Sequence, residues 1–450
     1  MTNKSMFNKY NKKNSLIIIS EYLPVQKAST GLGWYTSNTQ KSLINDKSII
    51  ITNKIGKNDK IYEENNALIV RCFEKSNPFS LFKIIYYVMK LNKAKNILFE
   101  FEFASYGNIL SVSIIPFILF SLKILGNKTY FALHQVADNL NRLNAHLGLS
   151  KDSPVISILN MGLGIFYKSV GLFSTKVIVL EEEFKQRINK YINKDKVTFI
   201  PIGIDNLSTK SNHDLRSKMN VGKNDFIILV FGYIAWYKGI DRLIDSFNNI
   251  SASLKNRNLK LIIAGGYSQA QAGKAHYEKY YQTIKNRAEE NKRITITGFI
   301  PEDKIANYYS VSDLCIVPYR EFISSSGPLS LALSYQKPVI LSKELENYTE
   351  SVDFSKAMRL SGLEKNDLFI EINSNELMNK INRLITNSMY RKQLTKFSLK
   401  MRSYRSWKQI GQIYNNLFVK NTKKGFIFPK FSFNLKSRNL LITSLNYKKL

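Results

Sequence analysis

The chain has 450 residues, of which 44% are hydrophobic and 12% aromatic. That length exceeds what one hydrophobic core usually holds and predicts at least two domains, and the apolar content excludes wholesale disorder, a collagen-like fold and a coiled coil. The 66 basic and 34 acidic residues give a formal net charge of +32. This excess indicates an anionic partner, such as nucleic acid, an acidic membrane surface or a phosphorylated substrate. Alternatively, it reflects the joint abundance of Lys, Asn and Ile that an AT-rich gene encodes.

The two cysteines, Cys72 and Cys315, lie far apart in the chain. This argues against a disulfide framework or a cysteine metal site and predicts a reducing, cytoplasmic location. Residues 1–14 are predicted to form a polar N-terminal extension, because they lack the apolar stretch and cleavage site of a secretory signal. The apolar run from Ile109 to Leu122 is interrupted by Pro116, and its length fits a buried or interfacial helix better than a membrane span.

Short apolar runs alternate with helical patterns through the first half of the chain. Unbroken apolar strands separated by helices are typical of a parallel sheet covered on both faces. Residues 15–205 are therefore predicted to form an α/β, doubly wound Rossmann-like domain. Its strands are expected at 16–19, 48–51, 67–71, 96–101, 129–133, 176–180 and 197–200, with helices at 35–43 and 81–91.

The alternation restarts after a polar stretch at residues 206–224, which predicts a second doubly wound domain over residues 206–395, with a hinge near 203–211. From residue 377 the pattern is helical to residue 418. The tail, residues 420–450, has eight Lys or Arg, no acid and interleaved Phe, which is typical of a surface-binding segment. In the second domain, strands are expected at 226–230, 259–264, 294–297, 314–317 and 338–341, and helices at 240–250, 280–290, 301–310 and 329–335.

The sharpest local motif is the stretch Gly232–Gly239, which follows a strand and begins a helix. Gly232 permits a tight turn, and Lys238 stands where the helix starts, with its ammonium free to reach a phosphate. The same pattern also suits an ordinary turn with a solvated lysine.

A second motif, Ser324-Ser325-Ser326-Gly327-Pro328, follows the strand at 314–317. Hydroxyl residues at the capping position and a proline at the first helical position predict a helix N-terminus, which attracts anions. A merely well-capped helix is the alternative. Two anion-competent elements on neighbouring units of one sheet favour a diphosphate site.

In the first domain, Gly31 and Gly33 permit close approach of the backbone to a ligand, although the full GxGxxG motif is absent. His134 follows a strand, where it is either a binding group or a structural hydrogen-bonding histidine. Glu100 and Glu102 alternate along an apolar strand, and either pairing or functional burial explains them. The other histidines lack ligand-like spacing, so no metal site is predicted.

Gly232–Gly239, followed by an Ile-Asp-Arg-Leu-Ile helix, resembles the phosphate-binding turn of glycosyltransferase family 4, whose members have the two-domain GT-B fold. The resemblance covers about residues 15–418 and includes a helix, 396–419, that closes onto the N-terminal domain. The ordered set of segments is more specific than any single motif. The agreeing segments are 31–33, the strand ending in His134, 177–181, 200–205, 262–266, 297–301, 312–314, 326–340 and 406–407.

The resemblance implies a retaining transfer of sugar from a nucleotide diphosphate sugar, which is a substrate, with no metal and no other cofactor. Lys238 and His134 are then the catalytic residues, with Lys238 neutralising the leaving diphosphate and His134 contacting the transferred sugar. Fixed donors aimed at charge that builds in the transition state lower the barrier. The resemblance implies further binding roles for Gly232, Ser325, Ser326 and Gly327 at the donor diphosphate, for Gly298, Phe299 and Ile300 at the nucleobase, and for Gly31 and Gly33 beside phosphate and acceptor.

The chain departs from the family pattern at two places. Tyr233 and Ala235 stand where many members have an arginine, and Ile323 and Leu331 stand where the family has two glutamates. Glu321, slightly upstream, is the candidate substitute. Recognition of sugar and ribose by that pair of carboxylates is therefore not expected here.

These observations predict a glycosyltransferase of cell-envelope or polysaccharide biosynthesis that acts on a lipid-linked or glycan acceptor. It is expected at the cytoplasmic face of the cell membrane, held peripherally on anionic lipid by its tail, with no specific nucleic-acid partner. The alternative is a scaffold of the same fold that has lost catalysis and binds nucleic acid or another polyanion. The departures favour this alternative, whereas the scattered basic residues and the absence of a nucleic-acid motif count against it.

Overall fold

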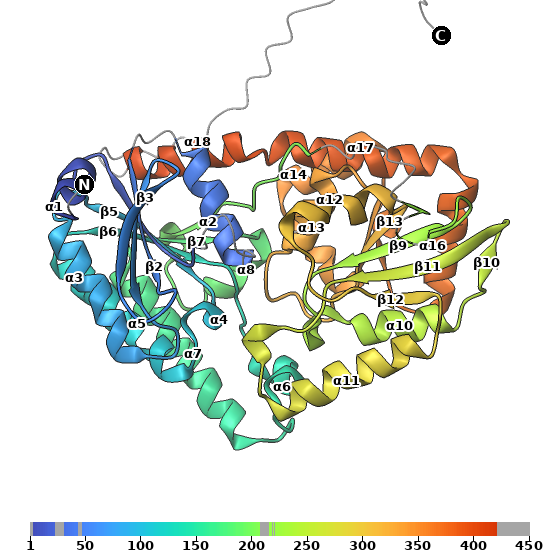
Figure 1. Ribbon diagram of the computed structural model, residues 1–450, viewed down its shortest axis with the longest axis horizontal. Helices are drawn as coiled ribbons and strands as arrows, with labels where there is room; N and C mark the ends of the chain where they lie inside the picture. The colour runs from blue at the N-terminus through green and yellow to red at the C-terminus, as the bar shows by residue number, and fades with distance from the viewer. Residues whose placement is uncertain are drawn as a thin grey trace, which may run out of the picture.

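Two mainly parallel sheets, each flanked by helices, lie side by side (Figure 1). The computed structural model describes residues 3–22, 31–43, 47–207, 216–217, 219 and 221–420. The predicted fold class, with two doubly wound Rossmann-like domains followed by C-terminal helices, is confirmed. Residues 421–450, nearly all of the predicted basic tail, lie outside the described residues.

The first sheet has the strand order β3-β4-β2-β1-β5-β6-β7-β8, and its neighbours are parallel except for the antiparallel pair β3 and β4. Seven strands match predicted ones with ends within two residues, because most are short apolar runs buried on both faces, whereas the edge strand β8 is only partly buried. The pattern does not predict β3, because this edge strand is polar. The strands are β1 (Leu16–Ile19), β2 (Ser48–Asn53), β3 (Lys60–Glu64), β4 (Ala67–Phe73), β5 (Asn96–Phe101), β6 (Lys128–Leu133), β7 (Lys176–Val179) and β8 (Val197–Phe199).

The second sheet has the order β10-β11-β9-β13-β14-β15, with β12 also paired to β11. Only β10 is antiparallel among its described strands. The strands are β9 (Phe226–Phe231), β10 (Ser253–Leu254), β11 (Arg257–Ala264), β12 (Ile294–Ile296), β13 (Leu314–Val317), β14 (Val339–Ser342) and β15 (Phe369–Ile370).

Helices α10 and α11 lie on one side of the second sheet, and α12 and α13 on the other (Figure 1). Short 3₁₀ turns η4 (Trp236–Lys238) and η6 (Lys343–Glu350) join some of the elements. The helices are α10 (Ile240–Asn248), α11 (Ala275–Glu289), α12 (Glu302–Val311), α13 (Gly327–Ser334), α14 (Val352–Ser361), α15 (Lys365–Leu368), α16 (Ser374–Thr386) and α17 (Ser388–Tyr404).

The first sheet is covered differently on its two faces. Alternate side chains of β1 face the two helical layers. Ile17 and Ile19 pack towards α3, α5 and α7, whereas Leu16 and Ile18 pack towards α2 and α18. The helices are α1 (Asn3–Tyr10), α2 (Gly31–Ser42), α3 (Phe82–Lys90), α4 (Phe103–Tyr106), α5 (Ile109–Ile124), α6 (Asn144–Leu147), α7 (Pro154–Phe173), α8 (Glu182–Ile188) and α18 (Trp407–Lys420).

The apolar run at 109–122 forms α5, which buries one side against the sheet and exposes the other. Among the described residues, α7 is the one helix long and apolar enough to cross a membrane. It buries Leu163, Phe166, Tyr167 and Val170 against the first sheet. Part of the predicted polar extension, residues 3–10, forms α1, which buries Met6 and Tyr10 in the same core.

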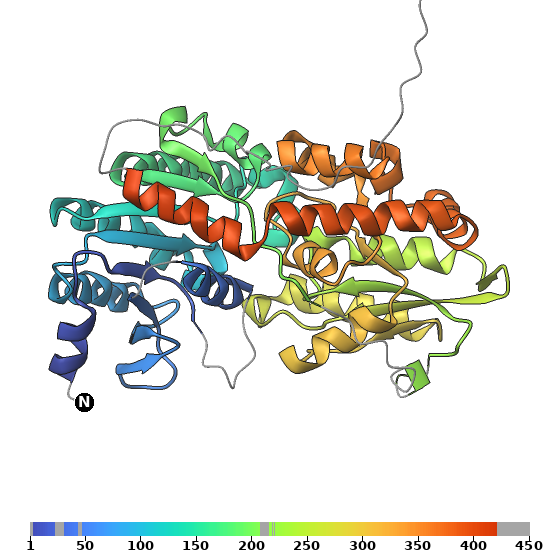
Figure 2. The ribbon, with the colours of Figure 1, turned by 90° about the horizontal axis from the view of Figure 1, so that it is seen from above.

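The chain crosses between the domains at Gly203–Asp205 and returns at Arg405–Trp407. The two crossings touch, because the Ile204 N–H donates to the Arg405 carbonyl at 2.7 Å. The predicted closing helix, 396–419, is divided by this return. Residues up to Tyr404 belong to α17, which packs on α13 and α14, whereas α18 lies on the first domain. Figure 2 shows α17 and α18 passing in succession over both domains.

The crossing depends on the absence of a side chain at Gly203, where a Cβ would lie 2.2 Å from the Trp407 ring. We predict that Gly203→Ala lowers the free energy of unfolding by about 1–3 kcal/mol, because the ring has to shift. Gly162→Ala, on α7 with no atom within 4 Å of the new methyl group, is the control and is expected to be neutral or stabilising by up to about 1 kcal/mol. Denaturant unfolding measures both, and an equally stable Gly203→Ala variant contradicts this account.

Candidate active site

The turn between β9 and α10, residues 232–239, is termed the glycine turn here. Gly232 and Gly239 have φ angles of 108° and 66°, a region that favours glycine. A Cβ at Gly239 would lie 2.2 Å from the Pro318 carbonyl oxygen. Both glycines are therefore required by the conformation, and the turn places Lys238 two residues before Ile240, the first residue of α10.

The Lys238 side chain is buried, with 8% of the residue exposed. Burial lowers the pKa of its ammonium to about 8, and the charge of Glu102 from the first domain partly opposes this shift. Among the described residues, no carboxylate lies within 4 Å of its Nζ. A buried cation without a close counter-ion is costly, so this geometry favours an anion next to Nζ.

Lys238 meets the start of α13 above Gly232. A Cβ at Gly232 would lie 2.9 Å from Lys238 Nζ and 3.3 Å from Pro328 Cγ. The two anion-competent motifs of the sequence are thus brought together at the carboxyl edge of the second sheet, where parallel sheets bind ligands. This convergence is what a shared diphosphate site requires.

Protein partners already occupy several polar groups at the α13 N-terminus. The Ser326 hydroxyl caps the helix by accepting from the Leu329 N–H at 3.1 Å, and the Ser326 N–H donates to the Tyr348 hydroxyl at 3.2 Å. The Ser325 hydroxyl donates to Glu181 of the first domain. The Gly327 N–H has no hydrogen-bond partner within the described part of the chain. In this conformation the Gly327 amide can therefore receive an anion.

The predicted nucleobase region adjoins the glycine turn through backbone contacts. The Ile234 N–H donates to the Gly266 carbonyl at 2.9 Å, and a Cβ at Gly266 would lie 2.8 Å from Gly298 Cα. Phe299 is 53% exposed and Ile300 is buried. An exposed aromatic ring next to the turn is suited to stack on a base.

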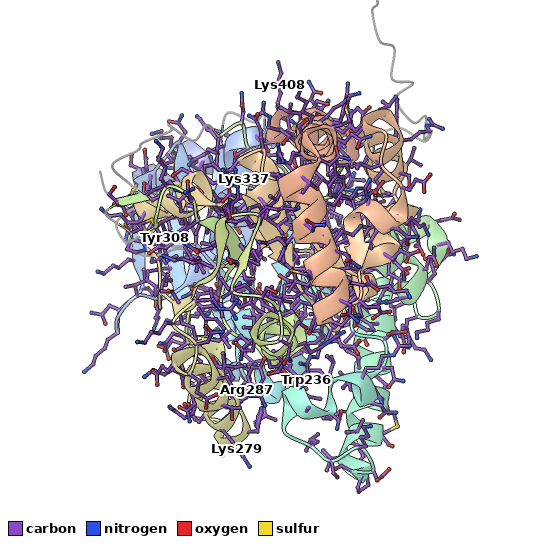
Figure 3. All side chains as sticks on the ribbon, turned by 90° about the vertical axis from the view of Figure 1, so that its right-hand side faces the viewer. Trp236, Lys279, Arg287, Tyr308, Lys337 and Lys408 are labelled. Carbon is purple, nitrogen blue, oxygen red and sulfur yellow. The ribbon has the colours of Figure 1, made fainter. Side chains whose placement is uncertain are left out.

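Three labelled residues help to locate this side of the second domain. In Figure 3, Trp236 of the glycine turn and Arg287 of α11 lie low on the molecule, whereas Lys408 of α18 lies at the top. The guanidinium of Arg320 stacks over the Trp236 ring at 4.5 Å, and Arg320 also pairs with Asp241 on α10. These contacts fix the outer side of the glycine turn.

His134, at the end of β6, is held from two sides. Its Nε2 lies 2.6 Å from Glu100 Oε2, and its ring packs edge-on against Tyr35 with 4.5 Å between ring centroids. The next residue, Gln135, pairs with Ser324 in a short antiparallel bridge between the domains. The structure therefore brings His134 to the segment that leads into α13. Pairing and functional burial were the two explanations for Glu100, and the structure shows that Glu100 pairs with His134.

Glu102 is the site residue that sequence reasoning did not assign. It follows β5, accepts a hydrogen bond from Gln135 Nε2 at 3.0 Å, and is the carboxylate whose charge acts on Lys238. Burial raises its pKa, against the opposing positive charges of His134, Lys75 and Lys238. The alternation of Glu100 and Glu102 along the strand was the one sequence signal that pointed to Glu102. The sequence does not show that Glu102 faces the second domain.

The remaining candidates are Gly31, Gly33 and Glu321, and the Glu321 N–H donates to the Tyr237 carbonyl of the glycine turn at 3.3 Å. Gly31 and Gly33 form the first turn of α2, which reaches the site through Tyr35 and its contact with His134. Glu321 is half-buried, and burial raises its pKa, while Arg142 and Arg187 of the first domain oppose the shift. Glu321 is not among the groups whose charge acts on Lys238. In the described ranges, no three His, Cys, Asp or Glu residues are grouped to hold a metal ion.

A buried charge network joins the domains behind α13. The Arg405 guanidinium donates to Asp353 at 2.6 Å and 2.9 Å, and its NH1 lies 3.9 Å from Glu181 Oε2. Burial raises the pKa of Glu181 to about 7, although Arg405 and Ser325 favour its charged form. Arg405 lies closer to Asp353 than to Glu181, so it compensates the charge of Asp353 more strongly. The surroundings of Glu181 therefore favour its protonated carboxyl.

Comparison with known proteins finds a family whose match lies mainly in the second domain. Residues 211–401 match the family described as Glycosyl transferases group 1. An uncharacterized glycosyltransferase of Methanocaldococcus jannaschii is 26% identical over 180 residues, 38% of this chain and 42% of that protein. The UDP-N-acetylglucosamine–N-acetylmuramyl-(pentapeptide) pyrophosphoryl-undecaprenol N-acetylglucosamine transferase of Finegoldia magna is 24% identical over 225 residues, 48% of this chain and 55% of that protein. The chain therefore spans about half the length of the curated relatives it matches.

Solved structures resemble nearly the whole chain. Sucrose-phosphate synthase of Thermosynechococcus elongatus superposes with a TM-score of 0.66 at 17% identity, covering 90% of this chain and 99% of that one. HepE of Anabaena, solved in complex with UDP, gives 0.61 at 15% identity, covering 90% and 100%. The fold is that of the GT-B glycosyltransferases. The expected resemblance to group 1 glycosyltransferases is confirmed, and assignment to family 4 stays a prediction.

The raised pKa of Glu181 gives a testable pH dependence of stability. Between the ordinary glutamate pKa and pH 7, the native state holds a proton that the unfolded chain has lost, so stability falls as pH rises through this window. Glu181→Gln retains an acceptor for Ser325 but does not ionise. We expect its melting temperature to fall less than that of the wild type between pH 5 and pH 8.

Glu289→Gln, which changes an exposed carboxylate on α11, is the control and should keep the wild-type slope. Only the slope is compared, because removing a partner of Arg405 changes stability at every pH. An equal slope in Glu181→Gln contradicts the assignment of a raised pKa.

The lowered pKa of Lys238 can be measured directly by competitive acetylation followed by mass spectrometry across a pH series. We expect half-maximal reactivity near pH 8 in the wild type. Glu102→Gln should move that midpoint to lower pH, because it removes the negative charge that favours the ammonium. Glu321→Gln should leave it unchanged. A midpoint near the ordinary pKa of lysine in the wild type contradicts the burial of the Lys238 ammonium.

Proposed function

We propose that this protein is a retaining, family 4-like glycosyltransferase that transfers a sugar from a nucleotide diphosphate sugar, with no metal and no resident cofactor. The observation that carries the proposal is the meeting of Lys238 Nζ and the first turn of α13 above Gly232, within the domain that matches group 1 glycosyltransferases. Two structural neighbours, both of HepE, are described as bound to UDP and to UDP-glucose. A nucleoside diphosphate carries the negative charge that would balance the buried ammonium of Lys238.

In the proposed reaction a hydroxyl oxygen of the acceptor bonds to the anomeric carbon of the donor sugar as the bond from that carbon to the diphosphate breaks. Negative charge grows on the leaving phosphate, which takes up the hydroxyl proton. Lys238 is fixed at that position, so its stabilisation grows with the developing charge. Gly232, Gly327 and the Ser325–Ser326 segment line the same anion site, and Gly298 to Ile300 border the base. Gly31 and Gly33 border phosphate and acceptor in this proposal, through the first turn of α2.

His134 contacts the transferred sugar in this proposal, and Glu100 is its positioning residue. The 2.6 Å contact between Glu100 and His134 Nε2 fixes the orientation of the ring, which leaves Nδ1 as the nitrogen available to a ligand. Glu102, between Gln135 and Lys238, is a carboxylate supplied by the first domain in a site that lacks the glutamate pair of the family.

We propose a lipid-linked or glycan acceptor and a role in cell-envelope or polysaccharide biosynthesis at the cytoplasmic face of the membrane. The excess of basic residues supports this, as does the name of the Finegoldia magna relative, which describes an undecaprenol-linked acceptor. Each basic residue near an anionic surface contributes about 1 kcal/mol, so the basic tail adds to such binding. A specific nucleic-acid partner is not part of this proposal.

A panel of nucleotide sugars tests the proposal through the melting temperature. A donor that binds the native state stabilises it, and the base and sugar that give the largest increase identify the donor. If none raises the melting temperature while single-stranded nucleic acid does, the alternative of a polyanion-binding scaffold replaces the transferase.

Substitution of Lys238 tests the site itself. We expect Lys238→Ala to stay folded, to lose the stabilisation by the donor and to lose transfer by about a hundredfold or more, because a fixed charge at the leaving group is removed. Lys279→Ala, which removes an exposed lysine on α11 (Figure 3), should transfer at the wild-type rate. Full transfer by Lys238→Ala counts decisively against the site.

A further inference from the structure

Three neighbouring helices of the first domain expose large apolar side chains along their outer sides. Fourteen such residues on η1 (Pro78–Leu81), α3, α5 and α7 are between 37% and 80% exposed, which is two-thirds of all the large apolar side chains exposed in the described residues. Together they are termed the apolar face. They are Phe79, Phe82, Tyr86, Met89, Ile109, Leu110, Phe117, Phe120, Ile124, Val155, Ile158, Met161, Ile165 and Leu172.

The residues of the apolar face form stripes that are continuous from helix to helix. On α7 they recur every three or four positions, at 155, 158, 161 and 165, which places them on one side of the helix. Contacts join the helices, with ring centroids 5.7 Å apart for Phe82 and Phe117 and 5.3 Å apart for Phe120 and Phe173. All three helices bury their opposite sides against the same face of the first sheet. Exposed apolar patches of this extent mark interaction sites.

The charge on these helices has one sign. The segments α3, α5 and α7 contain no Asp or Glu, and they carry Lys83, Lys90, Lys123 and Lys168. Lys83 pairs with Asp59, whereas Lys123 donates to the Leu172 carbonyl, a contact that leaves its charge uncompensated. The exposed lysines Lys90, Lys123 and Lys168 therefore accompany the apolar side chains without acidic neighbours on the helices themselves.

We propose that the apolar face lies on an anionic lipid bilayer, with its side chains in the interfacial region and its lysines among the headgroups. Apolar residues combined with snorkelling lysines are the pattern of an interfacial helix. A second copy of the chain is a poor occupant, because a symmetric contact would bring the lysines of both copies together with no acid to pair them. The helices lie on the surface and do not span it, because the opposite side of each is packed on the sheet.

This inference goes beyond the proposed transfer reaction and does not depend on it. It also differs from binding by the tail, because α18 covers the opposite face of the sheet from α5 and α7 (Figures 1 and 2). One end of the apolar face is close to the candidate site, since Ile109 follows Glu102 by seven residues, through α4. A membrane under this face therefore presents a lipid-borne acceptor to the first-domain side of the site.

Sedimentation of the full chain with vesicles tests the proposal. The vesicles contain phosphatidylcholine alone or mixed with phosphatidylglycerol. The test variant is I158E/I165E, which places two acids on the exposed side of α7. The control is V352E/M389E, which adds the same charge at residues that are 82% and 63% exposed on the second domain. We expect the wild type and the control to bind the anionic vesicles equally and I158E/I165E to bind about tenfold or more weakly.

A third variant, which lacks residues 421–450, separates the apolar face from the tail. If the truncated variant still binds the vesicles and I158E/I165E does not, the result supports binding through the apolar face. Loss of binding in both variants also supports it. Binding by I158E/I165E at the wild-type level overturns the proposal. So does a wild-type dimer that I158E/I165E converts to a monomer in analytical ultracentrifugation, since a second copy then covers the face.

Stabilisation by nucleotide sugars, measured on the same variants, keeps this result separate from the proposed function. I158E/I165E should respond to the donor as the wild type does, because both side chains are exposed on the outer side of α7. If no nucleotide sugar stabilises any variant, the transferase proposal fails and the vesicle result still decides the membrane proposal.

Discussion

A lysine ammonium buried above the bare Cα of Gly232 is the interaction on which the candidate site depends. The turn reaches this arrangement through two glycines with positive φ, one of which also makes room for Nζ itself. No carboxylate of the described chain neutralises Lys238 at contact distance, and the closest acid acting on it comes from the other domain. The site is thus built with a positive charge in excess, and the N-terminus of α13 adds to that excess. This is the electrostatic arrangement that an enzyme needs when its leaving group is a diphosphate.

The second requirement is that the two domains stay together, because each contributes part of the site. The first domain supplies His134 and Glu102, and the second supplies Lys238 and α13. The bridge between Gln135 and Ser324 ties these parts together, and the network of Arg405, Asp353 and Glu181 lies behind α13. Several hydroxyl and amide groups of the predicted anion site are engaged in these contacts. The proposed donor site and the packing of the domains therefore use the same groups.

The helical layers of the first domain have different surroundings. On one face of the sheet, α2 and α18 are packed under the chain that returns from the second domain. On the other face, α3, α5 and α7 bury their inner sides and leave their outer sides apolar and basic. The hydrophobic core needs only the inner sides, so the stability of the fold does not explain the outer ones. A surface that covers the outer sides of these helices would explain why they are apolar and basic.

The sequence by itself determined most strands of both sheets, since fully buried parallel strands are unbroken apolar runs whose ends are set by turn residues. It also picked out Lys238, His134 and the capped helix at Ser326 as candidates, because each lies in a segment that follows a strand, at the edge where parallel sheets bind ligands. It did not indicate the polar edge strand β3 or the two-residue strands β10 and β15. Nor did it indicate α7, whose residues are apolar nearly all round and so lack a clear helical period. Only the tertiary structure decided that Glu102 faces Lys238, that Ser325 is engaged by Glu181 and that three apolar stripes join into one face. Each of these depends on residues far apart in the chain, and local patterns record which side of an element is apolar but not which element lies opposite to it.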